Sequence, residues 1–324
     1  MKTTAFIGLG MVGGSLARGM AGAGDRILGW DQLPGVRSLA KRSGIEIIEP
    51  LEMAEEADLI VVATPPDRAG TLIRELLRSG ARAVTDTASV KVPVAAALEG
   101  LDPELSCRWI GGHPMAGTQN SGWESADPKI FTGMTWALCS DVQPRLDVLL
   151  EVSRLVDVFD GAMLPVSPED HDQAVAFSSH SVQIIQQVLA AGLSDRPALF
   201  HRLSGPGLRD STRLAESPLD GMWEEIIEEN RPALLDSIEG LIGDLEQARQ
   251  AIDDRNSEEI RALWRAGSLG RERLIDLRWQ KRYWRRASLP LGRWWPELLQ
   301  LGRNGTMIRR PHEDSGALLL FERG

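Results

Sequence analysis

The chain has 324 residues, a formal net charge of −10 at pH 7, and 43% hydrophobic against 25% charged residues. This length suits two domains of ordinary size, and the acidic balance argues against general nucleic-acid binding. The two cysteines, Cys107 and Cys139, lie far apart, which excludes a disulfide framework and favours a reducing cytoplasm. No apolar stretch reaches the ~18 residues that a membrane-spanning helix needs, and the first residues do not resemble a secretory signal. We therefore expect a cytoplasmic protein with neither a membrane nor a nucleic acid as its partner.

The first half of the sequence alternates short apolar runs with helical stretches, a pattern typical of a parallel sheet flanked by helices. A first helix is predicted over residues 14–23. Strands are predicted over residues 4–8, 26–31, 59–64, 83–86, 109–112, 135–139 and 156–159. Residues 1–166 are therefore expected to form an α/β dinucleotide-binding domain of the Rossmann-like kind.

From residue 167 onward the apolar period becomes helical and strand patterns almost vanish. Helices are predicted over residues 171–193, from 217, from 230, and from 256 to about 286. Residues 167–286 are thus expected to form an all-helical domain whose wide apolar faces pack against a second subunit in a homodimer. Proline and glycine punctuate residues 287–324, which predicts an irregular tail with one closing strand over 316–321.

A glycine fingerprint, Gly8-Leu9-Gly10-Met11-Val12-Gly13, lies at the first strand-to-helix turn. In such a turn Gly8 allows a tight bend, Gly10 lets the backbone approach a pyrophosphate, and Gly13 permits close helix–strand packing. Met11 and Val12 open the helix, whose N-terminal N–H groups are available to phosphates. The pattern predicts a dinucleotide site, although a glycine-rich turn without a nucleotide remains an alternative.

Asp31 ends the second predicted strand, close to the spacing at which a carboxylate accepts hydrogen bonds from the adenosine ribose. Such a carboxylate repels a 2′-phosphate, so the sequence favours NAD over NADP. Thr64 and Pro65 follow another strand and are expected at the same sheet edge, where ligands gather in these folds. The alternatives are a surface carboxylate at Asp31 and a proline that only ends a strand.

His113 stands among glycines after the strand predicted over 109–112, so its ring is expected in a loop at the sheet edge. An imidazole suits accepting a proton near neutral pH while hydride leaves the same substrate carbon. Ser89, three residues after Asp86 at another strand end, could hydrogen-bond the same substrate atom. The alternatives are a structural histidine and a serine that caps the next helix. Lys91 is interpreted as a surface or helix-start cation.

Two arginines four residues apart, Arg209 and Arg213, follow the flexible segment Gly205-Pro206-Gly207. On one helix face they could present their guanidinium groups to a carboxylate of the substrate. On an acidic protein, the alternative is ordinary salt bridging at the surface.

Together these motifs resemble the prephenate and arogenate dehydrogenase family of tyrosine biosynthesis. The resemblance spans roughly residues 4–280 and includes the glycine fingerprint. Its other segments are Asp86–Lys91, Gly112–Gly122, Ser167–Asp172, Ser179-His180 and Gly205–Trp223. It implies a Rossmann-like domain followed by a helical dimerisation domain. It also implies an NAD-dependent oxidoreductase that decarboxylates the cyclohexadienyl acid prephenate to 4-hydroxyphenylpyruvate.

The resemblance also implies roles for individual residues. His113 would take the proton of the ring hydroxyl, and the hydride from that carbon would pass to the nicotinamide. Ser89 would hold His113 and the hydroxyl in line, and Thr118 would line the pocket. Arg213 matches the family's arginine that binds a substrate carboxylate, and Arg209 occupies a position that is basic in family members.

One departure from the family pattern concerns the substrate side chain. Many prephenate-using members carry a second histidine three residues after the one that matches His180, and this chain has Gln183 there. Glutamine can hydrogen-bond but supplies no positive charge, so the pattern leaves open the choice between prephenate and arogenate. An amino-substituted prephenate of specialised metabolism is also compatible. Prephenate is the preferred interpretation because the other motifs resemble bacterial members.

Two further classes of protein compete with this interpretation. A β-hydroxyacid dehydrogenase or imine reductase would carry a catalytic lysine on the first helix of the second domain, and residues 171–193 contain none. A nonenzymatic NAD-binding or nucleic-acid-binding protein would draw on residues 278–295, where basic residues alternate with aromatic ones. Because the whole chain is acidic, packing of these aromatic side chains is the favoured interpretation.

Overall fold

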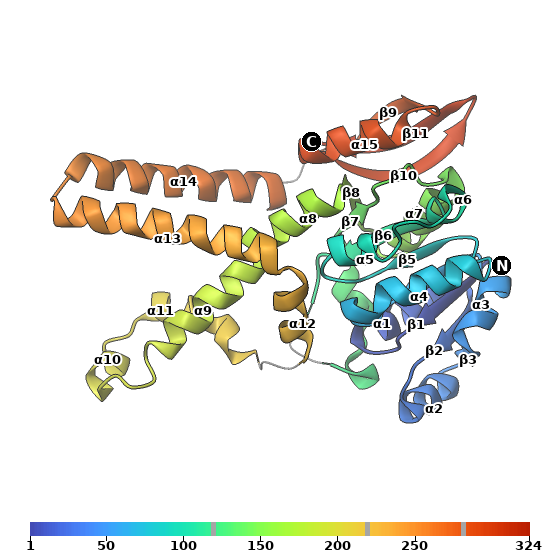
Figure 1. The fold of residues 1–324 in the computed structure, drawn as a ribbon, viewed down its shortest axis with the longest axis horizontal. Coiled ribbons are helices and arrows are strands. Elements are labelled where there is room, and N and C mark those ends of the chain that lie inside the picture. Colours follow the sequence, from blue (N-terminus) through green and yellow to red (C-terminus); the bar gives the residue numbers. More distant parts are fainter. Residues whose placement is uncertain (118–120, 218–220, 280–282) are drawn as a thin grey trace. The chain divides into compact units, whose positions relative to one another are not determined.

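The computed structural model describes residues 1–117, 121–217, 221–279 and 283–324 (Figure 1). The chain divides into two compact units. Unit 1 comprises residues 1–171 and 282–324, and unit 2 comprises residues 172–281. The helical segment is therefore inserted into unit 1, whereas the sequence predicted boundaries after residues 166 and 286 and a separate tail.

Unit 1 is built on an eleven-stranded sheet. In spatial order its strands are β3 (Glu46–Ile47), β2 (Arg26–Trp30), β1 (Thr3–Ile7), β4 (Leu59–Val62), β5 (Val84–Asp86), β6 (Trp109–Pro114), β7 (Thr135–Cys139), β8 (Ala162–Val166), β10 (Met307–Asp314), β11 (Ala317–Arg323) and β9 (Arg285–Pro290). The strands from β3 to β6 are parallel to one another. Strand β7 is antiparallel to β6 and parallel to β8, and β10, β11 and β9 continue the sheet in antiparallel fashion.

Helices cover both faces of this sheet because successive residues of its strands point to opposite sides. Phe6 of β1 joins one apolar core, and its neighbours Ala5 and Ile7 join the other. The first core also receives residues from α1 (Met11–Gly22), α2 (Pro34–Arg42), α7 (Leu146–Val158) and α15 (Trp294–Arg303). The second receives residues from α3 (Pro50–Glu56), α4 (Pro66–Arg78) and α5 (Val92–Ala96). The short helix α6 (Pro103–Ser106) lies before β6.

One predicted strand is wrong. Residues 156–159 end helix α7, in which Val148, Val152, Leu155 and Val156 are buried at helical spacing. The strand at this point of the chain is instead β8, which the sequence did not indicate. Pro165 lies within β8, and a proline argues against a sheet strand because it cannot donate to the ladder.

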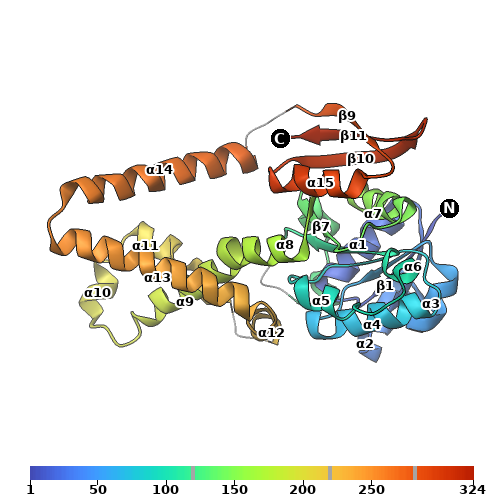
Figure 2. The same ribbon diagram turned by 45° about the horizontal axis from the view of Figure 1, so that its top comes forward.

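The expected irregular tail is also wrong. The described residues 283–324, called the C-terminal module below, form β9, α15, β10 and β11 (Figures 1 and 2, red). The closing strand predicted over 316–321 corresponds to β11. Two of its glycines lie between elements: Gly305 precedes β10, and Ser315-Gly316, both with positive φ, form the two-residue turn between β10 and β11. Gly305 and Gly316, which suggested an irregular tail, thus lie in the short connections of a folded module.

Unit 2 is helical, as predicted. It contains the second half of α8 (Pro168–Val175), a π-helical turn (Ala176–His180), α9 (Ser181–Ala191), α10 (Ala198–Arg202), α11 (Pro206–Asp210), a 3₁₀ turn (Arg213–Glu216), α12 (Gly221–Glu229), α13 (Arg231–Asp253) and α14 (Ser257–Trp279). Helices α13 and α14 lie side by side in both views (Figures 1 and 2). Asn256 caps α14 by accepting from Glu258 N–H and Glu259 N–H, each at 3.2 Å. In the described part of the chain, no helix has the length and apolarity to cross a membrane.

The C-terminal module contributes large side chains to the core of unit 1. Trp295 is 2% exposed, and its Nε1–H donates to the Ser140 carbonyl oxygen at 3.2 Å. We expect Trp295→Ala to lower the free energy of unfolding by about 3–5 kcal/mol, the usual cost of truncating a buried aromatic side chain. Urea unfolding followed by circular dichroism measures this loss. Tyr283→Ala, at a 94% exposed position of the same module, is the control; equal stability of the two variants would contradict the integration of the module.

Candidate active site

The first strand-to-helix turn is shaped by three glycines under different constraints. Gly8 has φ = +92°, and a Cβ there would collide with the Ala63 carbonyl oxygen after β4. A Cβ at Gly13 would overlap the carbonyl oxygen of Gly8, so α1 packs directly on the turn. Around Gly10, at the N-terminal end of α1, a Cβ would meet nothing within 4 Å. Gly8 and Gly13 therefore hold the helix close to the strand, while Gly10 leaves the turn open to a ligand.

Asp31 ties this turn to the second strand. Its carboxylate accepts from Leu9 N–H at 2.8 Å and from Leu33 N–H at 2.9 Å, and the residue is 9% exposed. Met11 and Val12, in the first turn of α1, are half-buried. Asp31 is therefore no surface carboxylate, and it lies beside the open turn with lone pairs left to accept from a ligand hydroxyl.

Two buried polar atoms near this edge have no hydrogen-bond partner. They are Oγ1 of Thr64, just after β4, and Nε1 of Trp30, the last residue of β2. Pro65 is exposed and precedes α4. Buried polar groups are normally paired, and these two atoms lie where a polar ligand could pair with them. From β1 the sheet continues through β2 and β3 on one side and through β4 and β5 on the other. Folds of this kind bind dinucleotides at the carboxyl edge of the sheet where the strand order reverses, which is here between β1 and β4.

His113 lies in strand β6, not in the loop that the sequence predicted. It pairs with Ala137 of β7, and its side chain is half-buried. Its Nδ1 is 2.9 Å from Nε2 of His171, and the two rings meet edge to face with centroids 5.1 Å apart. His171, in the first turn of α8, is 3% exposed. The sequence placed His171 in a family motif but assigned it no role in the site.

This contact constrains the protonation of His113. A neutral imidazole carries one N–H and one acceptor nitrogen. If His113 is to accept a proton at Nε2, its Nδ1 must carry the hydrogen and donate to Nε2 of His171. His171 must then be neutral and carry its own proton on Nδ1. The pair can therefore hold His113 in the tautomer that a proton acceptor needs.

The segment from Asp86 to Lys91 is held by a buried ion pair. Lys91 and Asp86 have fully buried side chains, and Lys91 Nζ donates to Asp86 Oδ1. The same carboxylate accepts from Ala88 N–H at 3.0 Å and from Trp109 Nε1–H at 3.1 Å. The sequence predicted a surface or helix-start cation at Lys91: it does stand at the start of α5, but it is buried and not at the surface. Asp86 is the last residue of the buried strand β5. Its buried carboxylate pairs with Lys91, so the lysine side chain lies in the interior.

Ser89 lies on this segment, which runs beside the end of β6. A Cβ at Gly112 would lie 2.6 Å from the Asp86 carbonyl oxygen, so the glycine before His113 lets the segment pack against the strand. The cap of α5 is Lys91, with no side-chain hydrogen bond, so Ser89 does not cap that helix. Among the described residues the Ser89 hydroxyl has no hydrogen-bond partner and is available to a ligand.

The two arginines do not share a helix face. Arg209 lies in α11, which ends at Asp210, whereas Arg213 begins a separate 3₁₀ turn. Arg209 is exposed and its Nε pairs with Asp210 Oδ1 at 3.1 Å. Arg213 is exposed as well. The helical fork predicted from their spacing is therefore wrong, because the backbone leaves the helix between them.

Gln183 has a definite role in unit 2. It is 4% exposed, and its Nε2–H donates to the Leu214 carbonyl oxygen at 2.8 Å. Gln186, also on α9, accepts from Leu214 N–H at 2.9 Å. The two amides thus hold both backbone groups of the residue next to Arg213. Gln183 fixes the turn that carries this arginine.

His180 is buried inside unit 2. It is 2% exposed, its Nδ1 is 3.0 Å from Asn230 Nδ2, and it packs edge to face on Trp223. Asn230 also donates to the Asp172 carbonyl oxygen at 2.9 Å. His180 therefore connects α12 and α13 to the π-helical turn. Thr118 lies outside the described residues.

Three aromatic residues of the basic stretch, Trp284, Trp294 and Trp295, are packed within unit 1. Trp294 and Trp295 are each 2% exposed, and the guanidinium groups of Arg309 and Arg323 lie 4.8 and 4.7 Å from the Trp284 ring centroid. Tyr283, by contrast, is 94% exposed. Within the described residues, no group of three or more histidine, cysteine or acidic side chains could hold a metal ion.

A nucleotide-binding sheet with an open glycine turn, a histidine at its carboxyl edge and an inserted helical unit define a two-domain dinucleotide-dependent oxidoreductase. Residues 16–162 match the family model "prephenate dehydrogenase, nucleotide-binding domain", and residues 167–266 match the dimerization domain of the same enzymes. These segments cover most of the sequence. The chain belongs to the prephenate dehydrogenase family.

Individual relatives agree with this assignment. A prephenate dehydrogenase of Lactococcus lactis is 29% identical over 279 residues, which cover 82% of this chain and 76% of the relative. A crystal structure of prephenate dehydrogenase from Aquifex aeolicus, in complex with hydroxyphenyl propionate and NAD⁺, has a TM-score of 0.73 at 27% identity and covers 85% of this chain and 98% of its own. A Corynebacterium glutamicum structure, assigned provisionally as a prephenate dehydrogenase, has a TM-score of 0.80 at 26% identity and covers 94% and 97%.

The buried ion pair leads to a stability prediction. Lys91→Met leaves the Asp86 carboxylate buried without its cation, which we expect to cost about 3–5 kcal/mol of unfolding free energy. Urea unfolding measures the loss, and Lys41→Met, at an exposed position of α2, is the matched control. The double variant Asp86→Asn/Lys91→Met should recover much of the stability. Equal effects of Lys91→Met and Lys41→Met would contradict a structural role for the pair.

Proposed function

We propose that this protein catalyses the NAD-dependent oxidative decarboxylation of prephenate to 4-hydroxyphenylpyruvate, a step in tyrosine biosynthesis. The observation that carries the proposal is the pair formed by His113 and His171 at the carboxyl edge of a nucleotide-binding sheet of this family. In this proposal Nδ1 of His113 contacts His171, and Nε2 is the nitrogen that takes the substrate's proton.

His113 acts in this proposal as the general base. Its Nε2 takes the proton of the ring hydroxyl, and Nδ1–H donates to His171, which stabilises the imidazolium without adding a charge. The hydroxyl of Ser89 holds the substrate oxygen in line. NAD, when bound, accepts the hydride from the carbon that carries this oxygen. The ring carboxylate then leaves as carbon dioxide, the electrons of its bond complete the aromatic ring, and the ring oxygen takes back the proton from His113 to become the phenol hydroxyl of the product.

The cofactor is proposed to bind at the glycine turn. The N-terminal turn of α1, with Met11 and Val12, would donate backbone N–H groups to the pyrophosphate, which approaches over Gly10. Asp31 would accept from the adenosine ribose and disfavour a 2′-phosphate. Thr64 and Pro65 would line the same edge, where the unpaired Thr64 hydroxyl gains a partner.

Arg213 is proposed to bind a carboxylate of the substrate, because a guanidinium matches that group in two hydrogen bonds. Gln183 acts through this arginine, since it fixes the neighbouring Leu214. Arg209, paired with Asp210, adds a more distant positive charge. Because Gln183 carries no charge and is buried, arogenate or an amino-substituted prephenate is the second candidate substrate.

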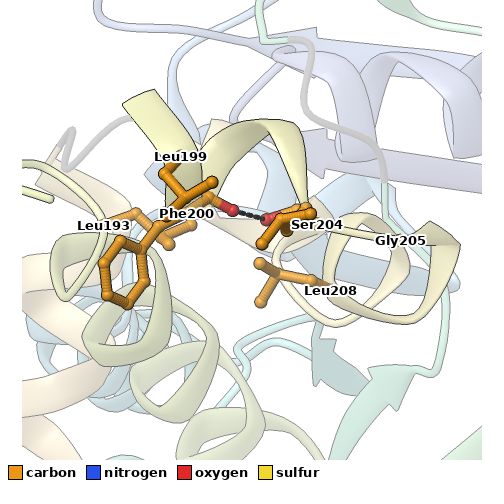
Figure 3. A pocket seen from close by; sticks show the side chains of 7 residues that line it. Leu193, Leu199, Phe200, Ser204, Gly205 and Leu208 are labelled. Atoms are coloured by element: carbon orange, nitrogen blue, oxygen red, sulfur yellow. Dashed lines mark hydrogen bonds between the residues drawn. The ribbon is translucent and has the colours of Figure 1, made fainter. Parts of the chain in front are cut away.

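Unit 2 is proposed to form a homodimer, in keeping with the dimerization-domain model that it matches. Unit 2 carries apolar side chains that are more than 60% exposed in the single chain: Phe177, Val188, Leu199, Leu203, Leu245, Ile252, Trp264 and Leu269. Leu193, Leu199, Phe200, Leu203, Ser204, Gly205 and Leu208 line an apolar pocket of about 400 Å³. Figure 3 shows this pocket from close by. Monomeric proteins rarely expose apolar surface on this scale, so a second copy would cover it.

A cytoplasmic location is proposed together with this activity. Cys139 lies in the core, Cys107 is partly exposed, and the two are not joined by a disulfide, which suits a reducing compartment.

The activity is tested by the absorbance of NADH formed with prephenate and, in parallel, with arogenate. We expect turnover of prephenate, with a higher kcat/KM than for arogenate. A reversed ratio would make arogenate the substrate. If NAD binds but neither acid reacts, the proposed reaction is wrong for this chain.

The histidine pair makes separate predictions. His113→Asn should lower kcat by about 10²–10⁴-fold, the usual contribution of a general base, and leave NAD affinity unchanged. His171→Phe keeps a ring but removes the acceptor for Nδ1–H, so we expect a smaller loss of about tenfold. His171→Gln, whose amide oxygen can accept that hydrogen, should retain more activity than the phenylalanine variant. Near-normal turnover by His113→Asn would show that another group is the base.

A further inference from the structure

The turn that carries His171 is held from two directions. On one side, the His171 ring meets His113 of β6. On the other, Asp170 Oδ2 accepts from Nε of Arg303, at the end of α15, at 2.8 Å. The backbone between them is fixed at its start, where Ser167 accepts from Asp170 N–H through its hydroxyl and from His171 N–H through its carbonyl oxygen. The Arg303 hydrogen bond lowers the pKa of Asp170, so the ion pair persists at neutral pH.

The rest of the C-terminal module seats α15 against β8, the strand that leads into this turn. A Cβ at Gly302 would overlap the carbonyl oxygen of Pro165, so the helix lies directly on the strand backbone. Leu298, one turn earlier, is fully buried. On the edge of β8, Ile308 of β10 pairs with Met163. The strand is therefore held both by a neighbouring strand and by a helix of the module.

The position of His171 in the chain explains why such support matters. Unit 1 ends at His171, and the next residue belongs to unit 2. This turn is therefore the point at which the chain leaves unit 1 for unit 2. The covalent path back from unit 2 leads into the C-terminal module. The C-terminal module, residues 283–324, lies outside the two segments that match the family models, which end at residues 162 and 266.

We propose that the C-terminal module positions His171, and through it His113, with Arg303 as a positioning residue and Gly302 as the point of closest contact. This inference rests on the proposed role of His113 as proton acceptor. The module keeps Nε2 of His171 at hydrogen-bond distance from Nδ1 of His113. Misplacing a catalytic group by about 1 Å can cost roughly 10²-fold in rate, so a small shift of this turn is measurable.

The first experiment compares Arg303→Gln with Arg293→Gln, which removes the same charge from the start of the same helix. Arg293 has no side-chain partner among the described residues. Arg303→Gln should lower kcat roughly three- to tenfold and leave NAD affinity and KM for prephenate within about twofold of the native values. Arg293→Gln should behave as the native protein, and Arg303→Lys, which keeps the charge, should retain most of kcat. Equal kcat for the native protein and Arg303→Gln would overturn the role of Arg303.

A second variant, Gly302→Ala, tests the contact between α15 and β8. Its methyl group must displace the helix from the strand, and we expect a loss in kcat of about tenfold or more. Thermal unfolding shows whether Gly302→Ala is folded. If it is not, the kcat values of Arg303→Gln and Arg303→Lys test the proposal instead. Native kcat in folded Gly302→Ala would overturn the proposal for the module.

The same variants are examined by NMR of ¹⁵N-labelled histidine, which is feasible because the chain has only five. The ring signals of His113 and His171 should shift in Arg303→Gln and Gly302→Ala, while those of His201 and His312 stay unchanged. This readout needs no turnover. If the native protein oxidises neither prephenate nor arogenate, the proposed function fails, and the histidine signals still decide whether the module positions the pair. Unshifted signals in both variants would overturn it.

Discussion

Unit 1 depends on close contacts between backbone segments, which are possible only where a glycine has no side chain. Helix α1 approaches β1 only because Gly13 lies on the carbonyl oxygen of Gly8. The segment that carries Ser89 reaches β6 across Gly112, and the C-terminal module reaches β8 through Gly302. Each contact fixes a segment near the carboxyl edge of the sheet without placing a side chain there. A methyl group at any of these places would move a helix or segment that carries part of the proposed site.

Pairing of buried polar groups supplies the second layer of organisation. Asp86 accepts from a lysine, an indole and a backbone amide, and Asp31 accepts from two backbone amides. In both cases the carboxylate follows a buried strand and fixes the segment after it. His113 and His171 also pair two polar side chains, here two imidazole rings and no carboxylate. Such pairs are costly to break, because a buried polar group that loses its partner cannot recover water.

Much of the nucleotide-binding half could be predicted from sequence because its signals are local. The strands around β1, β2, β4, β5 and β7 are short apolar runs, and the turn fingerprint lies in six consecutive residues. The prediction failed where distant contacts override local preference. Pro165 argued against β8, yet β7 and β10 pair with that strand. The four-residue spacing of Arg209 and Arg213 suggested one helix face, but the chain leaves the helix at Asp210.

The sequence by itself determined the class of fold, the dinucleotide turn, the helical second unit and His113 as the candidate base. These depend on patterns within a few residues, or on motifs that the family shares. Only the tertiary structure decided that Lys91 is buried, that Gln183 supports the turn of Arg213, that His171 contacts His113, and that the last forty or so residues complete the sheet. Each of these pairings joins residues brought together by folding. Their partners carry no mark in the local sequence, because burial and hydrogen bonding depend on what the rest of the chain places beside them.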